Sequence, residues 1–305
     1  MRLLVTGVHG FVGSTLSGMV SADDSLRHWK VIDLPVALDL RDRDAVADVV
    51  ADAAPDAVIH LAAQTFVPES VRDPETTFDV NLTGTLHLLQ ALQRHKFGGR
   101  MLFVGTGDVY GTVPEDELPV NERRLPAPRN PYAVSKVAAE ALCYQWTVTE
   151  RMHAVMARPF NHIGPRQSER FAVADFARQV AEIKRGDRPP VVQAGDIDVT
   201  RDFTDVRDVV RAYFALLAQG VSGEVYNICS GREHSLRSLL DLLAERADVD
   251  IRIDQDAARF RPSEQRRMRG DPAKIRSATG WRATIPIADS LNAMLDFWIT
   301  KEDHG

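Results

Sequence analysis

The start of the chain predicts a strand, a tight turn and a helix. A short apolar run at 3–5 breaks into three glycines spaced three residues apart, Gly7, Gly10 and Gly13, and apolar residues then resume. Glycines here would allow the turn, the close approach of a ligand to the backbone, and tight packing of the helix on the strand. A helix that begins this way offers free N–H groups to an anion such as a dinucleotide pyrophosphate. A glycine-rich turn without a ligand is the alternative.

Short apolar runs alternate with helical patterns through the first half of the chain. The run 57–61 is apolar without alternation, which is typical of a strand covered on both faces. We therefore expect an α/β fold with a Rossmann-type, doubly wound parallel sheet. The expected strands are 3–5, 31–32, 57–61, 101–104 and 154–157, and the expected helices are 11–20, 43–53, 75–95 and 131–150.

The pattern changes at about residue 160, where prolines and glycines become frequent. Helical patterns at 172–185, 205–219 and 235–247 are separated by short extended pieces. We interpret this part as a smaller C-terminal substrate domain that interleaves with the first. The expected dinucleotide-binding domain is 1–165 with about 205–230, and the expected nucleotide-sugar-binding domain is 166–204 with 231–305.

Composition limits the kinds of partner and site. The net charge of −6 argues against nucleic acid as a partner. The only two cysteines, Cys143 and Cys229, lie in apolar surroundings, which is typical of buried thiols. No clustered His/Cys pattern suggests a metal. No apolar run approaches the length of a membrane span, and the first strand leaves no room for a signal peptide, so we expect a cytoplasmic protein without membrane contact.

A second motif joins a tyrosine and a lysine on one helix. Asn130 is a good N-cap and Pro131 suits the first helical position, so a helix should begin here. Tyr132 and Lys136 are four residues apart and share a face of that helix. A nearby ammonium lowers the pKa of a phenol below its usual value of about 10, which makes a proton donor and acceptor usable near neutrality. An ordinary amphipathic helix start is the alternative.

Polar residues follow the apolar run that ends at Val104. In an open parallel sheet, ligands bind at the carboxyl ends of the strands. Thr106 is placed to hydrogen-bond a substrate oxygen there. The alternative is a hydroxyl that satisfies the backbone of its own turn.

Together these motifs resemble the extended short-chain dehydrogenase/reductase family, whose members act on nucleotide sugars. The resemblance covers nearly the whole chain, because further segments match in the same order. They are VIHLAAQ at 58–64, NLTGT at 81–85, RPFN at 158–161, RDFTDV at 201–206 and RPSE at 261–264.

The resemblance implies a role for each matching residue. It makes Thr106, Asp108, Tyr132 and Lys136 catalytic. Residues that would bind NAD(H) or NADP(H) are Gly7, Gly10, Phe11, Val12, Gly13, Asp33, Asp39, Leu40, Leu61, Ala62 and Ala63, together with Tyr132 and Lys136. Residues that would bind a GDP-sugar substrate are Thr106, Asn161, Arg201, Arg261 and Glu264.

Arginines gather near the last of these segments, at 259, 261, 266, 267 and 269. A guanidinium presents a planar fork of donors that matches phosphate oxygens. The cluster therefore suits an anionic ligand, and a solvated charged loop is the alternative, above all for Arg266, Arg267 and Arg269.

For the cofactor, Asp33 follows the second strand, where an acid would bond the adenosine ribose and repel a 2′-phosphate, which favours NAD(H). Arg41 lies nearby and is placed to accept that phosphate instead.

Three reactions compete on such a scaffold: 4-epimerisation, 4,6-dehydration and 4-keto reduction. Dehydratases of the family generally carry Glu where this chain has Asp108, and many have an acid where it has Gly107, so dehydration is disfavoured. The segments 158–168 and 171–179, and the short link from Asp33 to 39–42, resemble the enzymes that reduce GDP-4-keto-6-deoxy-mannose. That reaction would give GDP-D-rhamnose. Epimerase, dehydratase and a non-catalytic dinucleotide sensor remain alternatives.

The family often pairs through the helices that here carry Asn81 and Tyr132. By analogy, we expect a homodimer.

Overall fold

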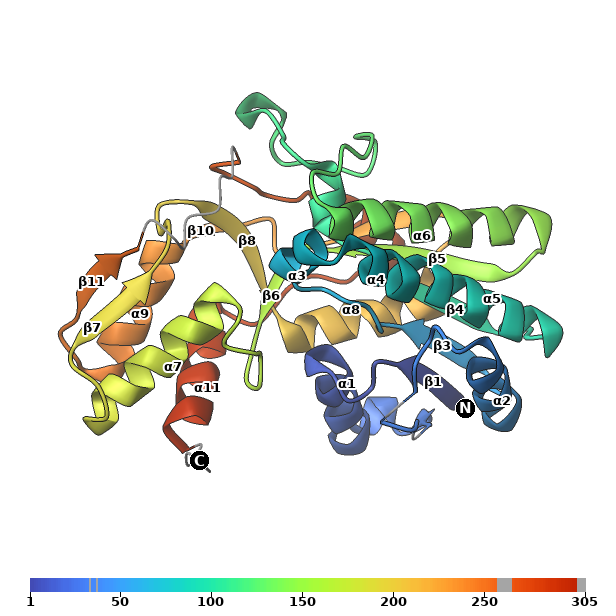
Figure 1. The fold of residues 1–305 in the computed structure, drawn as a ribbon, viewed down its shortest axis with the longest axis horizontal. Helices are drawn as coiled ribbons and strands as arrows, with labels where there is room; N and C mark the ends of the chain where they lie inside the picture. The colour runs from blue at the N-terminus through green and yellow to red at the C-terminus, as the bar shows by residue number, and fades with distance from the viewer. Residues whose placement is uncertain (33, 37, 257–264, 301–305) are drawn as a thin grey trace.

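The structure is a computed structural model that describes residues 1–32, 34–36, 38–256 and 265–300. Its larger part is built on a six-stranded parallel sheet with the strand order β2-β1-β3-β4-β5-β9 (Figure 1). All five expected strands are confirmed, and β9 was not predicted. The strands are β1 (Arg2–Thr6), β2 (Lys30–Val31), β3 (Ala57–His60), β4 (Arg100–Val104), β5 (His153–Pro159) and β9 (Val225–Ile228).

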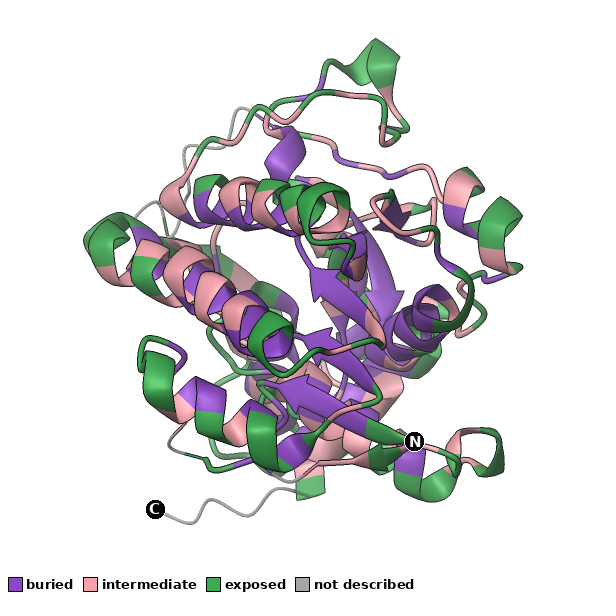
Figure 2. Ribbon diagram, turned by 90° about the vertical axis from the view of Figure 1, so that its right-hand side faces the viewer, coloured by how far each residue is buried: buried purple, intermediate pink, exposed green. Residues whose placement is uncertain are grey.

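Helices cover both faces of this sheet, which is why its strands are almost wholly buried (Figure 2). One group packs α1 (Phe11–Ala22) against α8 (Val206–Gln219), and α8 against α10 (Ala273–Thr279). The other packs α2 (Arg43–Ala53) against α5 (Gly84–Arg94), and α5 against α6 (Pro131–Thr149). The Rossmann-type arrangement is therefore confirmed.

The expected helix at 75–95 is interrupted. It consists of α4 (Pro74–Phe78), one π-helical turn at Asp79–Thr83, and α5, and a short unpredicted helix, α3 (Val67–Arg72), precedes it. π-Helical turns are rare and are found mostly at functional sites. This one holds Asn81, which is buried.

The smaller part lies to the left in Figure 1 and has two small sheets. The first is β6 (Asn161–Ile163), β8 (Thr200–Asp205) and β10 (Glu233–Ser235), and the second is β7 (Val191–Ala194) with β11 (Arg252–Gln255). Three helices pack together beside them, and the two that were expected are confirmed. They are α7 (Ala172–Arg185), α9 (Leu236–Ala247) and the unpredicted α11 (Ile287–Thr300).

Each part has its own cluster of buried apolar side chains. The larger cluster joins the six-stranded sheet to its covering helices, and a second one joins α7, α9 and α11 to β7 and β8. Cys143 and Cys229 are both free and buried, as expected. In the part of the chain that the structure describes, no group of His, Cys, Asp and Glu side chains is arranged to hold a metal ion. Within the same residues, no helix has both the length and the apolar character needed to cross a bilayer.

The glycine turn has the geometry that the spacing predicts. Gly7 has φ +75°, and a Cβ there would lie 2.9 Å from the nitrogen of Ala62. The Gly10 N–H donates to the Gly7 carbonyl at 3.0 Å, which closes the turn. A Cβ on Gly13 would lie 2.6 Å from Cα of Val8, so only glycine lets α1 pack this closely on the turn.

We predict that Gly13→Ala destabilises the fold by about 1–3 kcal/mol, because the added methyl group overlaps backbone that cannot move away. Gly18→Ala is the matched control on the same helix, since no atom lies within 4 Å of its Cβ position. It should stabilise the protein by up to about 1 kcal/mol through helix propensity. Urea denaturation of both variants tests this, and equal effects would contradict the packing role of Gly13.

Candidate active site

The N-terminus of α1 lies at the carboxyl end of β1 and is open to a ligand. Gly10 caps the helix without a side chain, and the first N–H groups of any helix, here from Phe11 onward, lack intrahelical partners. A Cβ on Gly10 would have only the Gly7 carbonyl oxygen within 4 Å, at 3.2 Å. The space above the turn and its unpaired donors therefore fit a phosphate group, as a dinucleotide requires.

The end of β3 lies beside this turn. The Ala62 N–H donates to Oγ1 of Thr6 at 3.2 Å, and the Leu61 N–H donates to the Thr6 carbonyl at 3.2 Å. Leu61, Ala62 and Ala63 are each half-buried. The structure thus brings these three candidate cofactor-binding residues next to Gly7.

Tyr132 and Lys136 occupy the first turns of α6. As predicted, Asn130 caps the helix, and its Oδ1 accepts from the Ala133 N–H at 2.8 Å. Both side chains are buried, with 8% and 2% of their surface exposed. The Tyr132 phenol is hydrogen-bonded to the hydroxyl of Thr106, so residues from α6 and from the end of β4 meet.

Thr106 makes the contact with its own turn that was the alternative for it, and it also contacts Tyr132. Its Oγ1 accepts from the Asp108 N–H at 3.2 Å and so caps the short helix Gly107–Tyr110. The same hydroxyl contacts the Tyr132 phenol. The local turn therefore orients the hydroxyl toward the tyrosine.

The expected effect of Lys136 on the Tyr132 pKa is not observed in the protein alone. Burial raises the pKa of Tyr132, and the Asp108 carboxylate raises it further, while the Thr106 hydrogen bond opposes the rise. Burial also lowers the pKa of Lys136, to about 8. The sequence argument treated the pair as if in water, whereas in the fold both groups lose hydration and each favours its neutral form. The phenol is thus protonated at neutral pH, as a proton donor must be.

The Lys136 ammonium has an unusual environment. Its Nζ lies 4.5 Å from the centroid of the Phe103 ring. The carboxylate one turn further along α6, Glu140, is bound by Arg158 in a buried two-point pair at 2.5 and 2.9 Å. Among the described residues, no carboxylate lies within ion-pair distance of Lys136. The ammonium therefore keeps hydrogen-bonding capacity that no carboxylate of the described residues uses.

A buried polar network links the glycine turn to α6, and the sequence analysis missed it. The ring of His60 lies 2.6 Å from Oγ1 of Thr6 and 2.9 Å from Oγ1 of Thr85, which donates to the Asn81 carbonyl. Asn81 then donates through Nδ2 to Oγ of Ser135 at 2.9 Å. Ser135 in turn donates to the Tyr132 carbonyl at 2.7 Å. The signal in the sequence that could have revealed this network is the presence of polar residues inside otherwise apolar runs.

Burial holds this network in one protonation state. It lowers the pKa of His60 to about 3, with a smaller contribution from the charge of Lys136. The imidazole is therefore neutral near pH 7, and each of its nitrogens contacts a threonine hydroxyl.

The loop after β2 carries three further candidate cofactor-binding residues, Asp33, Asp39 and Leu40. The Arg41 guanidinium donates three hydrogen bonds to Asp39, from Nη2 to Oδ2 at 2.6 Å and from Nε to both carboxylate oxygens at 3.0 Å, and both side chains are nearly half exposed. The side chain of Leu40 is buried and packs against Gly84. A Cβ added to Gly84 would lie 2.7 Å from the Cβ of Leu40. The Leu40 side chain thus packs the loop against α5, and its contact with a cofactor stays a prediction. Asp33 lies outside the described residues.

Arg201 is the strongest described candidate for an anionic substrate. Burial lowers the pKa of its guanidinium, and Nη1 donates to the Thr200 carbonyl at 2.7 Å. No carboxylate among the described residues forms an ion pair with it, although the charges of Asp108 and Asp196 act on it. Asn161 begins β6 and is exposed. Arg261 and Glu264 fall in the part of the chain that is not described.

The arginine cluster is divided. Arg266 pairs with Asp196, and Arg267 pairs with both Glu233 and Glu115. For these two arginines the solvated-loop alternative is favoured, because carboxylates of the protein already compensate their charge. Arg201 differs from them in having no such partner among the described residues.

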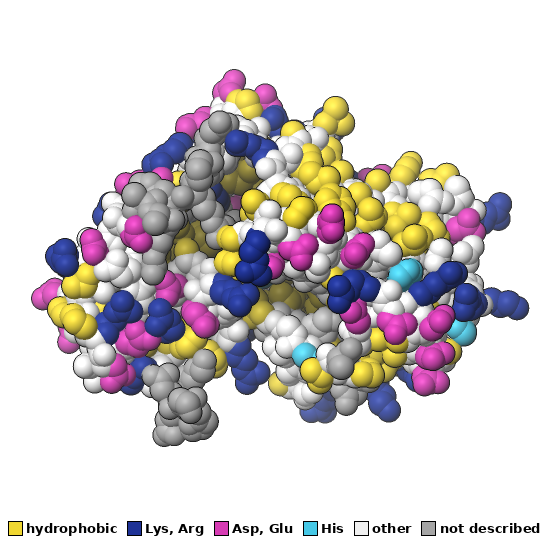
Figure 3. Space-filling view, in the orientation of Figure 1, with side chains coloured by type: hydrophobic (Ala, Val, Ile, Leu, Met, Phe, Trp, Pro, Cys, Tyr) yellow, Lys and Arg dark blue, Asp and Glu magenta, His cyan; other side chains and the backbone are white. Residues whose placement is uncertain are grey.

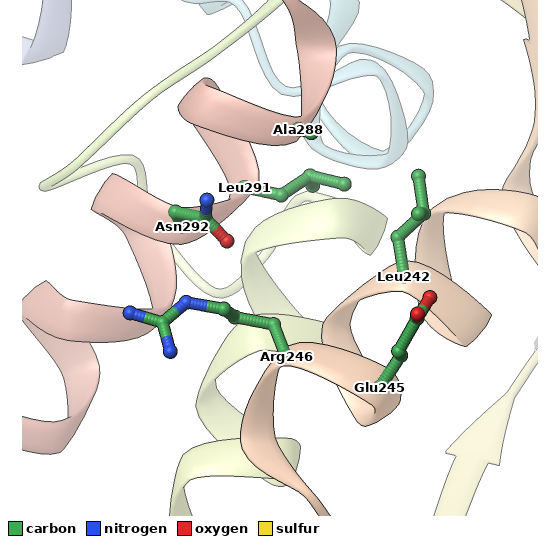
Figure 4. A pocket seen from close by; sticks show the side chains of 6 residues that line it. All are labelled: Leu242, Glu245, Arg246, Ala288, Leu291 and Asn292. Carbon is green, nitrogen blue, oxygen red and sulfur yellow. The ribbon is translucent and has the colours of Figure 1, made fainter.

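The surface agrees with a site between the two parts of the molecule. Figure 3 shows a hollow there, with Lys and Arg side chains near its rim. A different groove, between α9 and α11, is drawn in Figure 4. It carries none of the candidate site residues and is lined by Leu242, Glu245, Arg246, Ala288, Leu291 and Asn292.

Comparisons with known proteins show which family the chain is similar to. A family model described as GDP-mannose 4,6 dehydratase matches residues 24–294. The GDP-6-deoxy-D-mannose reductase of Pseudomonas aeruginosa is 50% identical over 300 residues, which are 98% of this chain and 98% of that protein.

Two solved structures share the fold over nearly the whole chain. The structure of RMD from Pseudomonas aeruginosa complexed with NADPH matches with a TM-score of 0.93 and 49% identity, covering 98% of this chain and 99% of that chain. The UDP-glucose 4-epimerase of Thermus thermophilus, in complex with NAD, matches with a TM-score of 0.85 and 31% identity, over 98% and 99% of the two chains. On its fold, its site and these matches, the chain belongs to the extended short-chain dehydrogenase/reductase family, in the group that the GDP-mannose 4,6 dehydratase model describes.

Proposed function

We propose that this protein is a GDP-4-dehydro-6-deoxy-D-mannose reductase. It reduces the C4 keto group of GDP-4-keto-6-deoxy-mannose with a nicotinamide cofactor and releases GDP-D-rhamnose. The observation that carries the proposal is the contact between Thr106 and Tyr132 beside the buried Lys136, in a chain that is 50% identical to a GDP-6-deoxy-D-mannose reductase over its whole length. The epimerase and dehydratase alternatives have weaker support, since those relatives are more distant.

The proposed mechanism assigns the proton to Tyr132. When bound, the cofactor supplies the hydride that C4 accepts. The Tyr132 phenol gives its proton to O4, which becomes a hydroxyl, and the Thr106 hydroxyl donates a hydrogen bond to the same oxygen as charge develops there. The Lys136 ammonium holds the nicotinamide ribose and stabilises the phenolate that remains.

Asp108 acts through Tyr132 in this mechanism. Its carboxylate raises the pKa of the phenol, so that the tyrosine is protonated before each turnover. A reductase removes no proton from C5, so it does not need the longer Glu that dehydratases carry at this position.

For the cofactor we propose NADPH, with NADH as the weaker substrate. Support comes from the RMD structure, which is complexed with NADPH, although the epimerase structure contains NAD. Arg41 is the proposed partner of the 2′-phosphate, and it would have to exchange some of its contact with Asp39 for that contact. The proposal departs from the sequence argument that Asp33 favours NAD(H).

We propose that the two domains bind different ligands, with the bounds that the sequence predicts. Residues 1–165 with about 205–230 bind the cofactor, and 166–204 with 231–305 bind the nucleotide sugar, where Arg201, Arg261 and Glu264 serve the GDP-diphosphate with Asn161. The separate apolar clusters of the two parts support this, although Ile275 and Trp281, in and after α10, join the cluster of the larger part.

The decisive test is identification of the product. Purified protein is incubated with GDP-4-keto-6-deoxy-mannose and either NADPH or NADH, and the sugar is analysed by NMR. We expect GDP-D-rhamnose, one reduced cofactor consumed per product, and at least about tenfold faster turnover with NADPH. Conversion without net cofactor consumption would identify an epimerase, and binding without conversion would identify a sensor.

Tyr132→Phe is the control for the mechanism. It removes only the hydroxyl, so turnover should fall by about 10²–10⁴-fold while nucleotide-sugar affinity stays nearly unchanged. Turnover above a tenth of the normal rate would show that another group donates the proton.

The buried ammonium of Lys136 should cost stability in the cofactor-free protein. Since its folded pKa of about 8 lies below the unfolded value near 10.5, the unfolded chain binds more protons between these values, and stability rises with pH across that window. Lys136→Met should therefore stabilise the protein on the order of 2 kcal/mol near pH 7, and the gain should shrink above about pH 8. Urea denaturation of the variant and the unmodified protein, near pH 7 and above about pH 8, measures this gain in stability.

Lys30→Met is the comparison for this effect, because Lys30 is exposed and its charge is not buried. A gain for Lys136→Met that stayed constant with pH would mean that better packing, rather than the charge, is responsible.

We also propose a homodimer that pairs through α5 and α6. Tyr144 and Val148 on α6 are 54% and 62% exposed, and Figure 3 shows apolar side chains over this region. The variant Tyr144→Glu/Val148→Glu should sediment as a monomer while the unmodified protein sediments as a dimer. A monomeric unmodified protein would refute the pairing.

A further inference from the structure

Arg158 belongs to the RPFN segment at 158–161, and the proposed mechanism gives it no role. It lies near the carboxyl end of β5 and is 4% exposed. Its guanidinium donates to both carboxylate oxygens of Glu140, from Nη2 at 2.5 Å and from Nε at 2.9 Å. Glu140 is itself 8% exposed, so the ion pair is held inside the protein, on the helix that carries Tyr132 and Lys136.

The same ion pair also contacts the element that carries Thr106. The guanidinium carbon lies 4.9 Å from the centroid of the Tyr110 ring, and Tyr110 ends the short helix that Thr106 caps. A Cβ added to Gly105 would lie 3.5 Å from Oε2 of Glu140. The pair therefore lies between the end of β4 and α6, the two elements that supply the candidate catalytic side chains.

Glu140 has a second cation nearby. It follows Lys136 by four residues, a spacing at which helical side chains of opposite charge pair. The Glu140 carboxylate raises the pKa of Lys136, against the larger opposite effect of burial. Within the described ranges of the chain, however, Arg158 is the only cation at ion-pair distance from Glu140. A guanidinium fork satisfies both carboxylate oxygens, which a single ammonium does not do as well.

We propose that Arg158 is a positioning residue, which holds the Glu140 carboxylate and so keeps the Lys136 ammonium free for the cofactor. This inference rests on the proposed function. Without the guanidinium, Glu140 would be a buried carboxylate with Lys136 as the cation one helical turn away, and such a carboxylate needs a partner. An ion pair between the two would have to break before Lys136 could bind the ribose.

The test removes first the guanidinium and then the carboxylate as well. Calorimetry measures the dissociation constant of NADPH for the unmodified protein, for Arg158→Met and for Glu140→Gln/Arg158→Met. We expect Arg158→Met to bind NADPH about tenfold more weakly near pH 7, because Glu140 competes for the ammonium. The double variant lacks the competitor, so it should bind within about threefold of the unmodified protein. A pair with a merely structural role would leave the double variant as weak as the single one.

The pH dependence of binding gives a second readout. Burial lowers the pKa of Lys136 to about 8, so the unmodified protein should lose affinity for NADPH as the pH rises through that value and the ammonium is deprotonated. In Arg158→Met the freed carboxylate favours the ammonium, and this loss should move upward by about one pH unit or more. In the double variant it should return to near pH 8.

No other group that acts on Lys136 should titrate in this range. Burial raises the pKa of Cys143 far above its usual value and lowers the pKa of His60 to about 3. Burial also raises the pKa of Tyr132. All three side chains are therefore neutral near pH 8, and the shift reports on the ammonium and Glu140.

Three controls separate this effect from a general disturbance. The ligand 2′,5′-ADP lacks the nicotinamide riboside, so every variant should bind it as the unmodified protein does. Arg178→Met removes an arginine that also pairs with two carboxylates, but on α7, and should leave the binding of NADPH unchanged. Arg158→Lys keeps a cation beside Glu140 and should restore most of the affinity that Arg158→Met loses.

The proposal is overturned if Arg158→Met binds NADPH with the affinity and pH dependence of the unmodified protein, or if the double variant is as weak as the single one. Should Arg158→Met not fold, the double variant decides alone, since near-normal binding supports the proposal and weak binding overturns it. An unmodified protein that binds NADPH but does not reduce GDP-4-keto-6-deoxy-mannose would refute the proposed function, while the dissociation constants would still test the role of Arg158.

Discussion

The burial of a phenol and an ammonium on adjacent turns of α6 is the constraint on which the rest of the site depends. Removing Tyr132 and Lys136 from water costs free energy, because a buried charge without a partner is unfavourable. The surrounding residues limit that cost. Arg158 neutralises Glu140 one turn further along, the ring of Phe103 faces the ammonium, and Thr106 bonds the phenol. Cofactor binding would supply the oxygen partners that Lys136 lacks among the described residues.

The same site requires that two distant elements keep a fixed separation. The glycine turn at the end of β1 and the first turn of α6 are joined by a chain of buried hydrogen bonds through His60, Thr85, Asn81 and Ser135. The π-helical turn around Asn81 places its side chain in that chain, where it bonds the backbone of Gln64 as well as Ser135. Because every member is buried and neutral, the network supports the geometry without adding charge. The network thus fixes the position of the glycine turn relative to the first turn of α6.

Much of this arrangement could be predicted from local sequence. The glycine spacing anticipated a turn that excludes side chains, and Asn130-Pro131 anticipated where α6 begins. The five strands and most helices followed from apolar runs and their lengths. Strand β9 was missed because it returns to the large sheet from the second half of the chain, after a stretch that pairs elsewhere. The loop arginines were ambiguous for a similar reason, since the carboxylates that pair with Arg266 and Arg267 are remote in sequence.

The sequence by itself determined which chemical groups are present and which local conformations they adopt: a left-handed glycine turn, a capped helix with a tyrosine and lysine on one face, and a hydroxyl at the end of a strand. These depend on residues a few positions apart, where steric and capping rules suffice. Only the tertiary structure decided the protonation states, because burial outweighs the pairing of charges that sequence suggests. It also decided which arginine keeps its charge available and which one binds Glu140, since both are set by contacts between segments that the chain brings together only when folded.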